Sequence, residues 1–238
     1  MNFKKTNNNS KIIFIPIVIF LLTTSELISE INHKNFSNEP IPKEITNDYF
    51  PLDTTLQLLY NTSFGEALSV IKKTDNGYIL DIRNDDFYFV QTVEVMNDTV
   101  YLKNLDENVD VFLFISAGVK VSYEQPSVRF PFPLTLNESW LWKGVELIDG
   151  ANPDTITVSG KVIDKEILET EAGNFDCIKF QIDINKKKSG SHTKFYEWRT
   201  PKIGLVKLEA YIDSKGFIGT IMDLLGYDKM DLTLKKIL

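Results

Sequence analysis

The sequence has very few residues that could support metal or thiol chemistry. Its 238 residues include one cysteine, Cys177, and two histidines, His33 and His192. No His-Glu-x-x-His or Cys-x-x-Cys spacing is present, so we expect no metal site. Calcium on the acidic residues 106–110 is the alternative, although their spacing is not that of an EF-hand loop. A single cysteine cannot form an internal disulfide. Cys177 lies in an apolar strand pattern, and we expect it to act as a small half-buried hydrophobic residue and not as a reactive thiol.

Clustered positive charge is also scarce. The formal net charge is −7, whereas nucleic-acid binding requires a concentrated basic surface. The one dense basic run of the mature chain is Lys186-Lys187-Lys188, followed by Ser189-Gly190. A run of this composition between two strand patterns predicts a solvated hairpin loop. The sequence therefore predicts no nucleic-acid partner.

Catalytic signatures are missing as well. No Gly-x-Ser-x-Gly elbow presents a nucleophile, and no glycine-rich loop could hold a phosphate. Carboxylate pairs such as Asp85-Asp86 and Glu169-Glu171 are typical of solvated turns and strand faces. We therefore predict a protein that is not an enzyme and binds no cofactor, with an enzyme of unrecognised site as the weakest alternative.

The amino-terminal segment predicts export. Lys4, Lys5 and Lys11 precede an apolar run over residues 12–22, and small residues follow it. Eleven residues are too few to span a bilayer, which requires about 20, so we predict a signal peptide over residues 1–25. An uncleaved anchor is the alternative. No cysteine follows the apolar run, so we expect no lipid anchor through cysteine. The predicted location is the periplasm or cell envelope.

The remainder predicts an all-β fold. A polar leader over residues 26–47, with Pro40 and Pro42, precedes a single β domain over residues 48–238. Residues 195–209 read as two alternating strands, and the break falls between Pro201 and Gly204. The other predicted strands cover residues 54–62, 66–72, 78–83, 87–96, 99–105, 109–116, 118–124, 137–144, 155–170, 175–184 and 230–235.

The breaks between these strands are too short to contain a crossover helix. We therefore predict a curved antiparallel meander sheet. A sheet this wide must curl, so we expect a half-open or closed barrel.

Three motifs carry a resemblance to a known family. They are Tyr49 to Leu52, Thr170 to Cys177, and the strand pair of residues 195–209. In this order they resemble small exported β-proteins of bacterial envelopes, including the TapB-type proteins. The sequence departs from that pattern at Thr55, Leu58 and Asn137. The resemblance implies a curved half-barrel similar in outline to lipoprotein carriers of the LolA/LolB type, and it implies no catalytic residues.

Aromatic residues supply the candidate binding site. Trp140 and Trp142 share one strand face by their period-two spacing, and so do Tyr196 and Trp198. On the concave side of a curled sheet they would bind a lipid or another hydrophobic small molecule. They could instead fill the core. We expect a monomeric envelope protein of uncharacterised role that binds a hydrophobic ligand. The alternative is a structural protein with a filled core that binds an envelope protein partner.

Overall fold

The structure, a computed structural model, describes residues 42–112, 115–213 and 229–238. The predicted signal peptide and most of the predicted leader lie outside these residues. The helix among the described residues is the short 3-10 helix η1, Asn47–Tyr49. No helix in the described part of the chain has the length and hydropathy needed to cross a bilayer.

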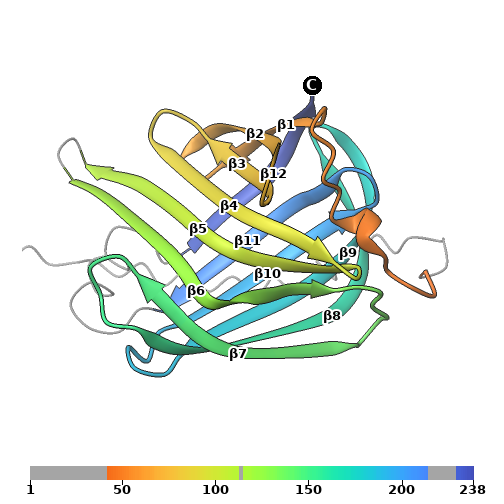
Figure 1. The fold of residues 1–238 in the computed structure, drawn as a ribbon. Helices are drawn as coiled ribbons and strands as arrows, with labels where there is room; N and C mark the ends of the chain where they lie inside the picture. The colour runs from red at the N-terminus through yellow and green to blue at the C-terminus, as the bar shows by residue number, and fades with distance from the viewer. Residues whose placement is uncertain (1–41, 113–114, 214–228) are drawn as a thin grey trace, which may run out of the picture. The chain divides into compact units, whose positions relative to one another are not determined.

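Twelve strands follow one another along the chain (Figure 1). They are β1 Gln57–Thr62, β2 Gly65–Thr74, β3 Gly77–Arg83, β4 Phe87–Met96, β5 Thr99–Phe112, β6 Ile115–Pro131, β7 Ser139–Ile148, β8 Asp154–Thr170, β9 Gly173–Lys186, β10 His192–Thr200, β11 Gly204–Asp213 and β12 Lys229–Ile237.

Each strand pairs antiparallel with the next, and β12 pairs with β1 to close the barrel. Most of the connections that the structure describes are turns of two or three residues, which can join only neighbouring antiparallel strands. Positive φ angles at Gly77 and Gly173 mark two of these turns. The predicted all-β fold, an antiparallel meander forming a barrel, is confirmed.

Between residues 99 and 131 the strand boundaries differ from the prediction. The sequence suggested three short strands, whereas the structure contains the two long strands β5 and β6. The polar residues near Asp106 resembled a turn. Asp106 instead continues β5 and pairs across the sheet with Lys120, whose Nζ lies 3.3 Å from Asp106 Oδ2. The polar residue Asp106 can therefore remain within a strand, because it forms an ion pair with the residue opposite it on the next strand.

The predicted corner between residues 195 and 209 joins β10 and β11. Lys202 and Gly204 have φ angles of 67° and 84°, so the turn uses left-handed backbone conformations that glycine adopts without strain. The register shifts once, between Trp198 and Arg199. β10 carries Glu197 and Arg199, two of the three charged residues of the candidate site described below.

A segment before the first strand packs against this corner. Ile45 forms an isolated bridge with Leu134 and is fully buried. The backbone N–H of Lys202 donates to Asp48 O at 2.9 Å. We call residues 45–52 the N-terminal segment. It carries Phe50 into the wall of the barrel interior.

Two clusters of buried apolar side chains fill much of the interior. One includes Phe130, Phe180 and Val162, and the other includes Tyr60, Leu208 and Leu234. Cys177 belongs to the second cluster and is fully buried. Burial raises the pKa of its thiol, with smaller contributions from Asp176 and Glu166.

Candidate functional site

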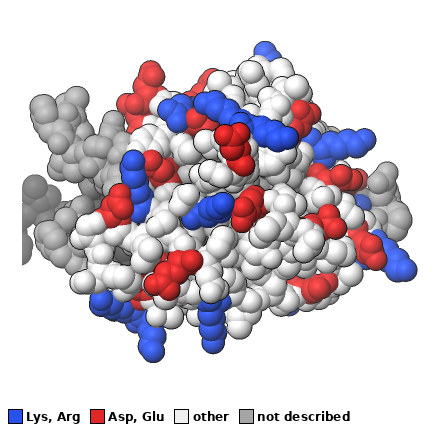
Figure 2. Space-filling view, in the orientation of Figure 1, with Lys and Arg blue, Asp and Glu red and all other residues white. Residues whose placement is uncertain are grey.

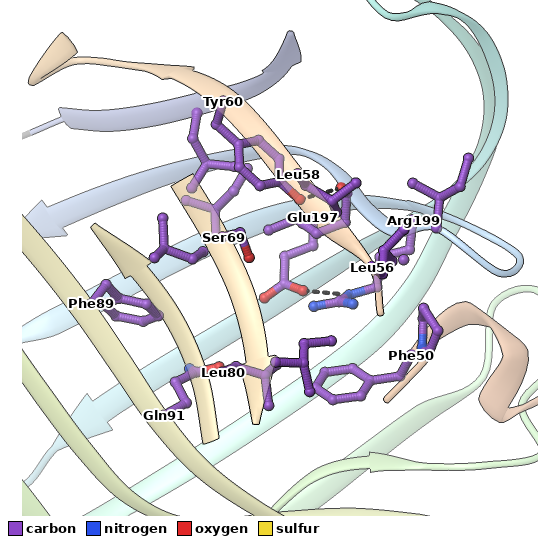
Figure 3. Close-up of a pocket in the computed structure, with 18 of the residues that line it drawn as sticks. Phe50, Leu56, Leu58, Tyr60, Ser69, Leu80, Phe89, Gln91, Glu197 and Arg199 are labelled. Carbon is purple, nitrogen blue, oxygen red and sulfur yellow. Dashed lines mark hydrogen bonds and ion pairs between the residues drawn. The ribbon is translucent and has the colours of Figure 1, made fainter. Parts of the chain in front are cut away.

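A cavity of about 70 Å³ lies inside the barrel between the two apolar clusters. Its walls come from β1 to β4, from β10 to β12, and from the N-terminal segment (Figure 3), and Arg129 of β6 completes them. Most lining side chains are apolar, among them Leu58, Ile71, Leu80, Phe89, Leu208 and Leu232. The polar members are Ser69, Gln91, Arg129, Glu197 and Arg199, together with the hydroxyl of Tyr60.

The size of the barrel accounts for this space. Side chains just fill an eight-stranded barrel, and the interior widens as strands are added. Twelve strands leave more space than the two apolar clusters occupy. The cavity is smaller than an engineered apolar cavity of roughly 150 Å³ that accepts benzene. It therefore suits a small apolar group or one end of a longer molecule.

A buried charged cluster forms one wall of the cavity. Glu197 is 0% exposed and receives a guanidinium on each carboxylate oxygen. Arg199 Nε donates to Glu197 Oε2 at 2.7 Å, and Arg129 Nη2 donates to Glu197 Oε1. Because each oxygen has a charged donor, the carboxylate is held in one orientation.

The strand register places these charges inside. Glu197 lies opposite Leu208 on β11 and opposite Phe180 on β9, and both of these side chains are buried. Arg199 is two residues further along the same face of β10. Its guanidinium carbon lies 4.5 Å from the ring centroid of Phe50 and 5.1 Å from that of Phe130. These rings provide cation–π contacts to a charge that has left water.

The electrostatics of Glu197 follow from this arrangement. Burial alone would raise its pKa, but the charges of Arg129 and Arg199 and their hydrogen bonds outweigh burial and lower the pKa below the usual 4.5. Burial lowers the pKa of Arg199, and the charge of Glu197 opposes this effect. An arginine in a protein stays protonated, so the cluster contains two positive charges and one negative charge.

A second polar group lies inside the barrel. Lys186 Nζ lies 2.7 Å from Glu146 Oε2, and Glu146 is buried opposite Tyr123 in the register. Burial raises the pKa of Glu107, while Lys186 opposes that effect. This group does not line the cavity. Among the residues that the structure describes, no set of three or more His, Cys, Asp or Glu side chains could hold a metal ion.

Trp140 and Trp142 lie on the inner face of the barrel. In the register, Trp142 lies opposite Val158, and Val158 lies opposite Ile184. Ile184 in turn lies opposite Thr193, which is on the same face of β10 as Glu197. Trp142 therefore faces the same side of the sheet as Glu197. Trp140 packs on Phe130, with ring centroids 5.8 Å apart. Neither indole lines the cavity. Within the described part of the chain, the buried Nε1 of Trp140 has no hydrogen-bond partner.

Tyr196 and Trp198 lie on the face of β10 opposite to Glu197, the outer face, where Trp198 is only 4% exposed and belongs to the second apolar cluster. Trp198 Nε1 donates to Glu166 Oε2 at 2.9 Å. The ammonium groups of Lys179 and Lys207 lie 4.5 Å and 4.9 Å from its ring centroid and cover it. The structure thus separates the four predicted binding residues into two inner and two outer ones. Their role as ligand-binding residues stays a prediction.

Sequence reasoning missed the charged cluster. Glu197 and Arg199 alternate with aromatic residues, and this alternation suggested that the charges face solvent. In the structure the two charged side chains instead face the interior. Glu197 can be buried there because Arg129 of β6 pairs with it, and a strand's own sequence does not reveal a partner on another strand. One available signal was the pair of opposite charges two residues apart on one strand face.

Comparison with known proteins extends this description. A family model described as DUF3108-like matches residues 145–223. A search of curated proteins gives no match. A proposed lipoprotein of known structure from Parabacteroides distasonis is 14% identical, with a TM-score of 0.42, and the match covers 80% of this chain and 98% of that one.

A proposed exported protein with a YmcC-like fold, from Bacteroides fragilis, is 17% identical, with a TM-score of 0.40. The match covers 79% of this chain and 97% of that one. Similarity at this level carries no argument about a ligand or a mechanism. The likeness to TapB-type and LolA/LolB-type proteins stays a prediction from the motifs.

Proposed function

We propose that the chain is an exported envelope protein whose barrel binds a hydrophobic ligand. The observation that carries this proposal is an apolar cavity enclosed by the strands with a few polar groups on its wall. That combination is typical of ligand sites, where apolar contacts supply affinity and sparse polar groups fix orientation. The N-terminal segment contributes part of the wall from outside the strands. Its displacement would enlarge the cavity for a longer chain.

The same wall is poorly suited to acid–base or nucleophilic chemistry. A general base near neutral pH needs a raised pKa, whereas the two arginines lower the pKa of Glu197. Ser69 is the one hydroxyl-bearing serine or threonine in the lining. No imidazole or thiol joins it among the described lining residues. We therefore propose binding without catalysis.

The proposed location rests on the sequence. The apolar run of residues 12–22 and the lysines before it support a signal peptide over residues 1–25. We propose that the mature protein works in the periplasm or cell envelope as a monomer. The domain packs as far back as Ile45, which falls within the predicted leader 26–47.

A cavity-filling variant tests the proposal. Ser69→Leu adds a branched apolar side chain on the cavity wall. Ser159→Leu makes the same change on the outer face of β8, where Ser159 opposes Leu141, which is 62% exposed. We expect the mature wild-type protein and Ser159→Leu to bind octanol in a calorimetric titration, and Ser69→Leu to bind it about tenfold more weakly or not at all.

Equal affinity in all three folded proteins would place octanol outside the cavity and contradict the proposal. Absence of octanol and octanoate binding to the wild-type protein would contradict it as well. Circular dichroism and thermal unfolding show whether each variant is folded, so that a loss of binding can be assigned to the cavity.

One observation favours partner binding as a second candidate function. β6 and β7 pair only over Val121 to Tyr123, so the remaining lengths of the two strands keep edges that an added strand could use. An envelope protein partner bound there would be recovered by cross-linking in cells. Leu141→Asp would lower its recovery if β7 forms part of the interface.

A further inference from the structure

We propose that the ligand carries one acidic group and that this group binds Arg129 and Arg199. The ligand class is then a monoanionic amphiphile, an acid with an apolar chain. This inference rests on the proposed binding function and adds the chemistry of the ligand's polar end.

The first argument is the balance of charge around the cavity. Arg129 and Arg199 share the single carboxylate of Glu197. The other polar lining groups, Ser69, Gln91 and the Tyr60 hydroxyl, are neutral. Burial raises the pKa of Tyr60, which keeps its phenol protonated. The lining that the structure describes therefore has a net charge of +1, since Glu146 and Glu107 lie outside the lining together with Lys186.

This excess is costly in an apolar interior. Two guanidinium groups that share one carboxylate recover only part of the hydration that they lose on burial. The aromatic rings of Phe50 and Phe130 lower that cost only in part. The outer surface has a different pattern, since basic and acidic side chains alternate over the face in view (Figure 2). Exposed side chains also form ion pairs, such as Lys120–Asp106 and Lys235–Glu66.

The second argument is unused hydrogen-bonding capacity. The Nε of Arg129 is buried and has no hydrogen-bond partner among the residues that the structure describes. Arg199 Nη1 makes a long contact of 3.4 Å with Tyr49 O. A guanidinium has five N–H donors, and Glu197 uses few of them. Two arginines with spare donors suit the two oxygens of a carboxylate, which guanidinium groups bind with charge-assisted hydrogen bonds.

The third argument identifies the remainder of the ligand. Aliphatic and aromatic side chains from six strands extend from the charged cluster around the cavity. A free inorganic anion would leave that apolar lining without a partner, and an uncharged apolar molecule would leave the arginines unbalanced. A molecule with an acidic end and an apolar chain satisfies both parts of the wall.

The test compares octanoate with octanol, which has the same chain length but no charge at neutral pH. Affinities are measured by calorimetry for the wild-type mature protein, Arg129→Gln and Arg83→Gln. Arg83 is the matched control, because its side chain is 55% exposed and pairs with Asp81, away from the cavity. Acetate and inorganic phosphate test whether a free anion suffices.

We expect octanoate to bind the wild-type protein about tenfold or more tightly than octanol, the difference typical of a charge-assisted hydrogen bond. Arg129→Gln should weaken octanoate binding and remove that difference, and Arg83→Gln should behave as wild type. Acetate and phosphate should bind much more weakly than octanoate.

Equal wild-type affinities for octanoate and octanol would overturn the acidic-ligand inference and leave the binding function standing. Phosphate or acetate affinity equal to that of octanoate would overturn it in favour of a free-anion site. If Arg129→Gln does not fold, the affinities of the wild-type protein for octanoate and octanol still test the acidic-ligand inference. If the wild-type protein binds neither octanol nor octanoate, the proposed function itself fails.

Discussion

Glu197 shows how a charged side chain can occupy the interior of this barrel. It is fully buried, yet both of its oxygens accept hydrogen bonds from arginines that arrive from different strands, β6 and β10. The cluster depends on all three residues, because removing one leaves an unbalanced charge in a medium of low dielectric constant.

Replacing the carboxylate should destabilise the protein strongly. Glu197→Gln leaves two buried guanidinium groups without a negative partner, and we expect a loss of about 3 kcal/mol or more in the free energy of unfolding. Glu94→Gln is the control, since Glu94 pairs with Lys103 at 3.0 Å in a partly exposed position. It should cost less than about 1 kcal/mol. Urea unfolding at neutral pH measures both, and equal costs would contradict a buried ionic role.

The lowered pKa of Glu197 predicts a dependence of stability on pH. The group contributes stability that is fully present above its ordinary pKa of 4.5 and is lost as the pH falls below that value toward the folded-state pKa. Wild-type stability should therefore fall more steeply than that of Glu197→Gln below pH 4.5. Parallel curves from urea unfolding across acidic pH would show that Glu197 titrates normally in the folded state.

Gly160 is required by its contact with Trp140. A Cβ at this position would overlap the indole ring of Trp140, which lies directly across the strand pair. We expect Gly160→Ala to lower the free energy of unfolding by about 1 to 3 kcal/mol, the usual cost of overpacking. Ser159→Ala, next to it on the outer face, should change stability by less than about 0.5 kcal/mol. Similar values for the two variants would mean that the ring moves freely.

At the scale of elements, the corner between β10 and β11 joins the sheet to the N-terminal segment. The corner could be predicted because proline and glycine constrain the backbone locally. The long strands β5 and β6 could not, since the ion pair of Asp106 with Lys120 links positions on two strands. The same limit applies to the cavity, because Arg129 meets Glu197 only when β6 and β10 face each other across the barrel.

Gly204 tests the contact between the corner and the N-terminal segment. Its φ is 84°, and an added Cβ would lie 2.9 Å from Pro51 Cδ. Gly150 has a similar φ of 76° with no atom within 4 Å of such a Cβ, so it isolates the cost of the backbone conformation. We expect Gly204→Ala to cost about 1 kcal/mol more than Gly150→Ala in thermal or urea unfolding. Equal losses of unfolding free energy in the two variants would show that Pro51 can move away from the added Cβ without destabilising the protein.

At the scale of the whole molecule, closure of the barrel explains both its stability and its cavity. β12 comes from the end of the chain and pairs with β1, which removes two sheet edges at once. The alternation of apolar and polar residues predicted a curled sheet. It could not predict how much interior twelve strands would leave unfilled, because that depends on how large side chains from distant strands interdigitate.

The most direct test of the binding account is native mass spectrometry of the mature protein purified from its own envelope. The account predicts an adduct of lipid or fatty-acid size on the wild-type protein that disappears on delipidation. The adduct should persist in Ser159→Leu and be absent from Ser69→Leu. A wild-type protein that always carries only its sequence mass, or an adduct of equal abundance in both serine variants, would contradict a ligand bound in the cavity.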